Sequence, residues 1–191
     1  MGKTREGGLE MAQGRLARLE KYFLYFVLYS VIGWLYEVFL EVVVYRWGFS
    51  NRGVLFGPWC VIYGVGALVL ILALGGLKKR DIRVGNIPAT PLLVFLGIVV
   101  LTTALELLAS YLMEYLLGGW QWDYTRFAFN FQGRIALNPS IRFGLGGMVF
   151  LYILQPLFER LTGRMSPRAL HLAAGALALV MLLDAAWTFL L

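Results

Sequence analysis

Long apolar runs dominate this chain and decide what it can fold into. Hydrophobic residues make up 60% of the sequence and charged residues only 15%, a composition far from that of an ordinary soluble domain. A helix needs about 20 apolar residues to cross a bilayer, and runs of roughly that length recur along the chain. They predict an all-α polytopic transmembrane bundle of about five spans, at residues 22–45, 58–77, 91–117, 143–158 and 169–191.

The polar stretches between these runs are only as long as loops, so no separate soluble domain is expected. We predict a cytoplasmic N-terminal segment, residues 1–21, followed by a single transmembrane domain, residues 22–191. Cys60 is the one cysteine of the chain, which excludes an intrachain disulfide and a Cys-based metal cluster. We therefore expect no metal and no other cofactor.

Lys and Arg residues are divided unevenly between the two sets of loops. With the N-terminus inside, twelve of the 17 basic residues fall in cytoplasmic segments and five in outer ones. Because an excess of Lys and Arg marks the cytoplasmic side, we predict a cytoplasmic N-terminus. The net charge of +6 reflects this bias, and no nucleic-acid partner is expected.

The two outer loops are rich in aromatic residues, glycine and single polar residues. They read RWGFSNRGVLFGPW from Arg46 and GGWQWDYTRFAFNFQGRIALNPSIRF from Gly118. The aromatic residues are typical of an interfacial belt, but a belt does not explain the Arg and Asn residues between them. We predict that both loops are partly re-entrant and cap the bundle, because irregular backbone is tolerated there where protein or water surrounds it.

Two acids, Glu37 and Glu106, lie deep within apolar spans that contain no Lys or Arg. A charged carboxylate at the centre of a bilayer costs at least ~2.5 kcal/mol, so each acid should face protein or water and bind a partner. Both lie about 15 residues into their spans, roughly 22 Å from the inner boundary at 1.5 Å per residue. We expect Arg52 and Arg134 of the outer loops to be their partners. Such pairs would either line a substrate or ion pathway or only tie the loops to the helices.

Small and polar residues recur at helical spacing around both acids, so that each acid belongs to a stripe along one helix face. The stripes comprise Ser30, Gly33, Glu37 and Glu41 in the first span, and Thr102, Glu106, Ser110 and Glu114 in the third. Both stripes are expected to face protein or water.

Ordinary catalytic signatures are missing from the sequence. It contains no G-x-S-x-G nucleophile elbow, no phosphate-binding loop and no H-E-x-x-H zinc motif. We therefore assign no catalytic residue and expect no ATP hydrolysis by the chain itself.

Four segments resemble a known family when they are taken together. They are SVIGWLYE (30–37), NRGVLFGPWCVIYGVG (51–66), TTALE (102–106) and WDYTRFAFNFQGRI (122–135). In this order they resemble the bacterial and archaeal family labelled putative ABC-transporter type IV permeases, over residues 22–157. Thr125 stands where the family favours Ser.

The resemblance implies a multi-pass protein of a prokaryotic plasma membrane, with a separate ATPase subunit as its partner. Five spans are fewer than a typical ABC permease has, which implies a homo-oligomer or a second membrane subunit. The family positions coincide with the acids and loop residues named above. The predicted substrate- or ion-binding residues are Glu37, Asn51, Arg52, Glu106, Trp122, Asp123, Tyr124, Asn130 and Arg134.

The leading functional hypothesis is a binding or transport component of the lipid bilayer, with an acid–arginine site in the outer half of the membrane. One alternative is a membrane enzyme acting on a lipid-linked substrate, with Glu37 or Asp123 as acid or base and the arginines holding a phosphate. Another is a structural or regulatory subunit of a larger membrane complex.

Overall fold

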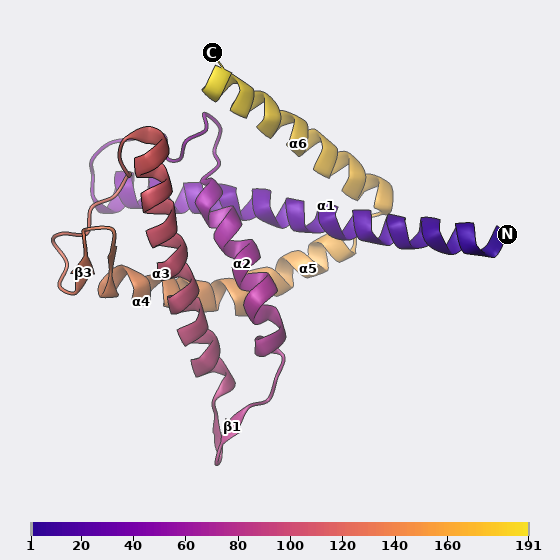
Figure 1. Ribbon diagram of the computed structural model, residues 1–191, viewed down its shortest axis with the longest axis horizontal. Coiled ribbons are helices and arrows are strands. Elements are labelled where there is room, and N and C mark those ends of the chain that lie inside the picture. The colour runs from indigo at the N-terminus through magenta and orange to yellow at the C-terminus, as the bar shows by residue number, and fades with distance from the viewer. Residues whose placement is uncertain (1, 191) are drawn as a thin grey trace. The chain divides into compact units, whose positions relative to one another are not determined.

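The structure is a computed structural model that describes residues 2–190, with side chains described from Gln13 onward. Helices form most of it, and strands occur in two short hairpins (Figure 1). Two π-helical segments, Leu40–Val44 and Phe150–Leu154, extend α1 and join α4 to α5. In chain order the other elements are α1 (Gly2–Phe39), α2 (Val61–Lys78), β1 (Arg83–Val84), β2 (Ile87–Pro88), α3 (Thr90–Leu117), β3 (Asn130–Phe131), β4 (Ile135–Ala136), α4 (Leu137–Val149), α5 (Gln155–Gly163) and α6 (Pro167–Leu190).

Five helical segments among the described residues are long and apolar enough to cross a membrane. They are Gln13–Val44, Val61–Lys78, Thr90–Leu117, Leu137–Gly163 and Pro167–Leu190. The prediction of a multi-pass helical fold with about five spans is therefore confirmed. The fourth segment is longer than predicted because the π-helical turn joins α4 and α5 without a break. The cytoplasmic side of the N-terminus, the re-entrance of the outer loops and the division at residue 21 stay predictions.

The chain folds into two compact units. Unit 1 comprises Met1–Leu68 with Phe158–Leu191, and unit 2 comprises Val69–Leu157. Each unit contains one of the two predicted acids and the outer loop that follows it in the chain. The units are therefore described separately.

In unit 1, α1 packs against α6, as Figure 1 shows for their crossing near the start of α6. Val27, Leu55 and Trp59 form a buried cluster against which side chains of α1 and α6 pack. The hydroxyl groups of Tyr25 and Thr162 are hydrogen-bonded at 3.0 Å. Burial of this apolar surface, at about 25 cal/mol per Å², draws the loop residues Leu55 and Trp59 onto the helices.

Glycines allow α1 and α2 to approach closely. A Cβ atom on Gly33 would overlap the ring of Tyr63, and one on Gly64 would overlap the hydroxyl of Ser30 and lie 2.6 Å from the carbonyl oxygen of Phe26. Helix contacts between small residues are typical of membrane proteins, where packing rather than water exclusion drives association. The sequence motifs around Gly33 and Gly64 thus allow α1 and α2 to cross closely.

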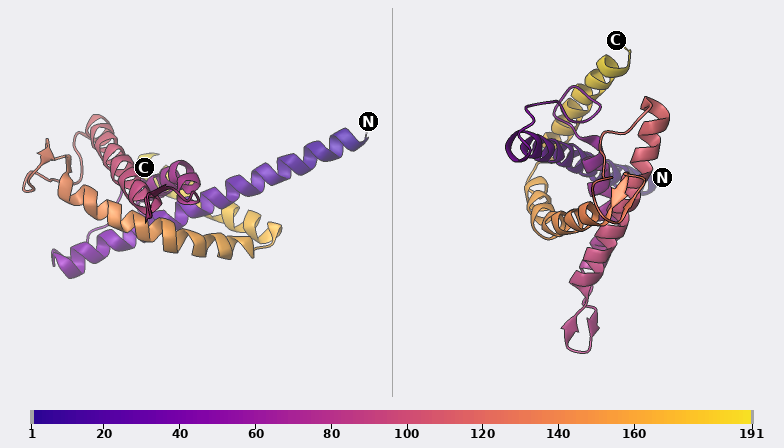
Figure 2. Two further views of the ribbon diagram at one scale, coloured as in Figure 1. Left: turned by 90° about the horizontal axis from the view of Figure 1, so that it is seen from below. Right: turned by 90° about the vertical axis from the view of Figure 1, so that its left-hand side faces the viewer.

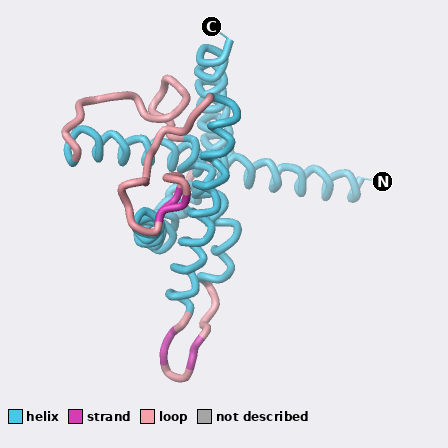
Figure 3. Tube along the Cα trace, turned by 60° about the vertical axis from the view of Figure 1, so that its left-hand side comes forward, coloured by secondary structure: helices cyan, strands magenta, loops and turns pink. Residues whose placement is uncertain are grey.

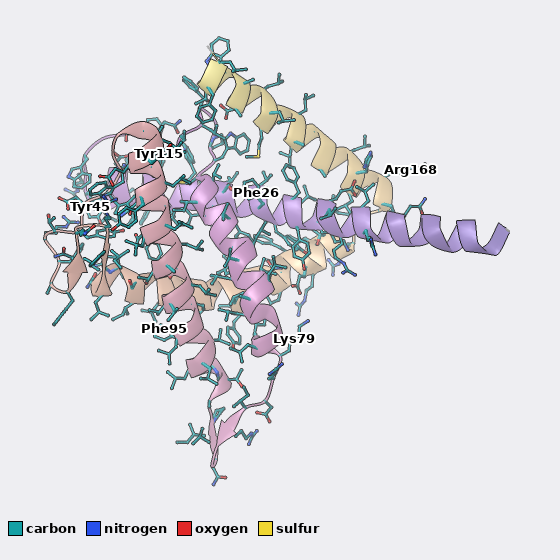
Figure 4. All side chains as sticks on the ribbon, viewed as in Figure 1. Phe26, Tyr45, Lys79, Phe95, Tyr115 and Arg168 are labelled. Atoms are coloured by element: carbon teal, nitrogen blue, oxygen red, sulfur yellow. The ribbon has the colours of Figure 1, made fainter. Side chains whose placement is uncertain are left out.

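In unit 2, α3 packs against α4. Gly144 and Gly147 of α4 lie against Phe95 and Ile98 of α3, leaving no room for a Cβ atom at either glycine. Phe95 is labelled near this crossing in Figure 4. Ile98 is completely buried, so the crossing is the centre of the packing in this unit.

The stripe of α3 is on its protein-facing side. Glu106 and Ser110 are buried, whereas Leu108, Leu112 and Leu116 are exposed on the other side of the helix. A leucine every four residues on an exposed face suits contact with lipid tails. The middle of the stripe therefore faces protein, whereas Glu114 near the end of α3 is 46% exposed.

The irregular segments lie at the ends of the long helices. The β1–β2 hairpin extends beyond the first turn of α3 (Figure 2), and its strands pair Arg83 with Pro88 and Val84 with Ile87. Figure 3 shows, in pink, the irregular loops that precede α2 and follow α3. The second of these loops ends in the β3–β4 hairpin, which leads directly into α4.

Candidate functional site

Arg52 of the first outer loop is bound by Glu41 of the π-helical segment that ends the first span. Its Nε donates to Glu41 Oε2 at 3.1 Å and its Nη2 to Oε1 at 2.8 Å. Ser50 donates to the same carboxylate from its backbone N–H and its hydroxyl. This two-point guanidinium–carboxylate geometry is the strong form of the ion pair. Glu41, rather than the predicted Glu37, therefore neutralises Arg52.

Glu37 lies one helical turn before Glu41 and accepts a short hydrogen bond from the hydroxyl of Tyr63 in α2. Among the described residues of unit 1, Glu37 has no Lys or Arg partner. The Tyr63 ring reaches Glu37 because Gly33, one turn earlier in α1, leaves space for it. The expected Glu37–Arg52 pair is thus corrected. Arg52 follows the first span by only a short loop, which favours the acid nearest the end of that span.

Asn51 organises the first outer loop. Its amide nitrogen donates to the carbonyl oxygens of Leu55 and Phe56 at 3.0 Å each, and its amide oxygen accepts from Trp34 Nε1 at 2.8 Å. Its side chain is therefore fully used in holding the loop turn against α1. Asn51 thus holds the turn from which Arg52 reaches Glu41.

Asp184 of α6 binds the end of the same loop. Its carboxylate accepts from the backbone N–H groups of Phe56 and Gly57 at 2.9 and 2.8 Å, and from Trp59 Nε1 at 2.5 Å. Adjacent backbone N–H groups form a concave site that favours an anion. No sequence pattern placed this carboxylate on the loop, because α6 is distant from the loop in the chain.

Arg134 of unit 2 lies between two aromatic rings. Its guanidinium carbon is 4.1 Å from the centroid of Tyr111 and 3.9 Å from that of Trp120. Its Nη2 is paired with Glu114, and its Nη1 donates to Ser110 Oγ at 3.3 Å. The arginine comes from the β3–β4 hairpin and all four partners come from α3 or the residues just after it, so the arginine fastens the hairpin to the C-terminal end of α3.

Glu106, which is 7% exposed, lies two turns before Glu114 and accepts a 2.7 Å hydrogen bond from the hydroxyl of Tyr124. The loop arginine of unit 2 is therefore paired nearer the end of α3 than predicted. The two units share one arrangement: an acid near the helix end binds the loop arginine, and a deeper acid accepts from a tyrosine.

The remaining predicted residues build the second outer loop. Trp122 Nε1 donates to the carbonyl oxygen of Arg134 at 2.8 Å. The carboxylate of Asp123 accepts from the backbone N–H and the hydroxyl of Thr125, at 2.9 and 3.0 Å. Asn130 donates to Phe127 and accepts from the N–H of Gly133. The hydroxyl of Thr125 is therefore one of the groups that close this turn.

A family model described as Putative ABC-transporter type IV matches residues 24–189. The chain belongs to this family. No curated protein and no solved structure matches it. The match extends past the 22–157 covered by the motifs and includes α6, the helix that carries Asp184. Family membership and the five span-length helices support a membrane transport component.

Several residues around Arg52 and Arg134 of this ABC-transporter type IV chain were not predicted as binding residues. Glu41, Ser110 and Glu114 belonged to the helical stripes, and their position nearer the loops was the available signal. No spacing pattern indicated Trp120 or Asp184. In the described part of the chain, no three His, Cys, Asp or Glu side chains gather as metal ligands would.

Proposed function

We propose that the chain is the membrane component of an ATP-driven transporter in the plasma membrane of a prokaryote. Its substrate- or ion-binding groups are the deeper acids, Glu37 and Glu106, together with the loop arginines Arg52 and Arg134, which Glu41 and Glu114 bind nearer the helix ends. The sequence lacks a phosphate-binding loop, so a separate ATPase subunit would supply the energy. Self-association of the chain would supply the further spans that such a transporter needs.

The observation that carries this proposal is the separation of Glu37 from Arg52. Glu41 already provides both carboxylate oxygens for the Arg52 fork, so Glu37 is not needed to neutralise the loop. Glu37 nevertheless occupies an apolar span, where ionisable groups are expensive and usually mark a substrate or ion pathway. The hydrogen bond from Tyr63 orients the Glu37 carboxylate. It does not pair that carboxylate with a cation.

The experiment compares two matched variants that lie one turn apart, Glu37→Gln and Glu41→Gln. Inverted membrane vesicles containing the chain and its native partners are assayed for ATP-dependent uptake of a panel of ions and small solutes. Thermal unfolding in detergent is measured for the same preparations. We expect Glu37→Gln to abolish chain-dependent uptake with little change in the unfolding midpoint, because Gln still accepts the hydrogen bond from Tyr63.

Glu41→Gln should instead lower the midpoint, because it leaves Arg52 without a counter-charge in a poorly solvated position. If deleting the chain changes no uptake, or if Glu37→Gln lowers the midpoint enough to account for all lost uptake, the transport proposal is wrong.

A further inference from the structure

Two buried N–H donors at the C-terminal end of α3 have no acceptor among the residues that the structure describes. One is Nε of Arg134, whose side chain is only 6% exposed, and the other is the indole Nε1 of Trp120. The guanidinium lies over the Trp120 ring, so both donors belong to one stack. Buried donors are normally matched, and two unmatched ones in a single cluster indicate a place for an outside acceptor.

A comparison with Arg52 shows which hydrogen bond Arg134 lacks. Arg52 uses Nε and Nη2, which form one edge of the planar guanidinium, to bind both oxygens of Glu41. Arg134 uses Nη2 for Glu114 and Nη1 for Ser110, which leaves the Nε half of that same edge unused. The edge matches two oxygens of a carboxylate or a phosphate. Arg134 therefore presents a half-used oxyanion-binding edge beside an indole N–H.

Glu114 is a replaceable occupant of this edge. Its side chain is 46% exposed, so it can turn toward solvent, and Tyr111 of the same stack is 41% exposed. Trp120 follows Gly118 and Gly119, neither of which has a neighbour within 4 Å of a Cβ position, so the backbone just before Trp120 is loosely packed. A singly charged oxyanion, such as a phosphodiester, that replaces Glu114 on Arg134 would leave the charge of the stack unchanged.

We infer that Arg134 and Trp120 form a binding subsite for a phosphate group, which takes the place of Glu114. The ligand accepts from Nε and Nη2 of Arg134 and from Nε1 of Trp120. This inference rests on the proposed function, because it names the chemical group that the unit 2 cluster would bind. A lipid headgroup and a water-soluble solute are both sources of this group.

The test uses the full chain purified in an uncharged detergent. Shifts of the thermal midpoint are measured with inorganic phosphate, with micelles containing phosphatidylglycerol, and with micelles containing an uncharged galactolipid. We expect stabilisation by phosphate, by phosphatidylglycerol or by both, and none by the galactolipid. A response to phosphate alone assigns a soluble solute, and a response to phosphatidylglycerol alone assigns a headgroup.

Three variants identify the site. Trp120→Phe keeps a ring over the guanidinium and removes the N–H, so it should weaken binding by about ten- to a hundredfold, the value of one hydrogen bond to a charged group. Without a probe it should be at least as stable as the parent, because it removes an unmatched donor. Glu114→Gln should tighten binding severalfold by weakening the competing occupant. Trp187→Phe, at an exposed position of α6, is the control and should bind as the parent does.

The inference is overturned if no phosphate-bearing probe stabilises the parent, if Trp120→Phe binds as tightly as the parent, or if Glu114→Gln weakens binding. These measurements need neither ATP nor a partner subunit and concern unit 2 alone. Their failure is therefore distinguishable from failure of the uptake assay, which depends on Glu37 in unit 1.

Discussion

The indole nitrogen of Trp59 donates a 2.5 Å hydrogen bond to the carboxylate of Asp184, which follows it by 125 positions in the chain. Together with the backbone donors of Phe56 and Gly57, this contact binds the first outer loop to α6. The loop in turn holds Asn51 and Arg52 against α1. Asp184, a single acid of α6, thus helps to position Asn51 and Arg52 beside α1.

Replacing Asp184 should therefore loosen the loop. Asp184→Ala leaves three N–H donors without their acceptor, and we expect it to cost about 2–4 kcal/mol, measured as a lower unfolding midpoint in detergent. Asp184→Asn keeps one acceptor oxygen and should cost less. The control is Asp81→Asn, because Asp81 forms a pair with Arg83 in which both side chains are more than half exposed, and such pairs contribute little. An unchanged midpoint for Asp184→Ala would contradict this account of the loop.

The crossing of α1 and α2 should be sensitive to one added methyl group. Gly33→Ala places a Cβ atom inside the Tyr63 ring, and such overpacking typically costs about 1–3 kcal/mol. Gly66→Ala provides the matched control in α2, because nothing lies within 4 Å of its Cβ position. We expect no loss of stability there, since alanine favours the helix over glycine by about 1 kcal/mol. Equal midpoints for the two variants would count against the close crossing.

Cys60, the residue before α2, should resist thiol reagents in the folded protein. Burial, and next the nearby carboxylate of Glu37, raise the pKa of the Cys60 thiol to about 12, compared with about 8.5 for a free cysteine. At pH 8 the folded chain then contains roughly a thousandfold less thiolate than an unfolded chain. Maleimide labelling should be slow in mild detergent and fast in denaturing detergent.

The raised pKa of Cys60 also determines how the stability of the folded chain depends on pH. Because the folded-state pKa of Cys60 is the higher one, its stabilising contribution is complete below about pH 8.5 and is lost as the pH rises toward 12. Glu37→Gln removes the second cause of the shift and should speed labelling. Rapid labelling of the folded parent at pH 8 would show that Cys60 is accessible and ionised.

The distribution of basic residues predicts the orientation of the chain. Reporter fusions at Gly85, in the β1–β2 hairpin, and at Gly163, at the end of α5, should report the cytoplasm. A fusion at Gln121, just after α3, should report the exterior. A cytoplasmic signal at Gln121 would invert the proposed topology and place both acid–arginine clusters on the inner side.

The helical class and the span count could be predicted because they depend on local quantities. A run of about 20 apolar residues specifies a transmembrane helix wherever it packs, since the backbone must satisfy its own hydrogen bonds in lipid. The stripe around Glu106 could be predicted for a similar reason, because residues spaced about four positions apart lie on one face of a helix. The motifs between Ser30 and Ile135 were sufficient to identify the family, and the family model confirms it.

The partners of each charged group were decided only by tertiary structure. Spacing placed Glu37 and Glu41 on one face but could not say which would meet Arg52, because the path of the loop depends on Asn51, Trp34 and Asp184 acting together. In unit 2, the stacking of Arg134 between Tyr111 and Trp120 required the β3–β4 hairpin to fold back onto α3. Ion pairs and ring stacks operate over a few ångströms, so a one-turn difference in position changes the partner. By itself, the sequence determined which residues are costly in a membrane, and the tertiary structure determined which of them compensate one another.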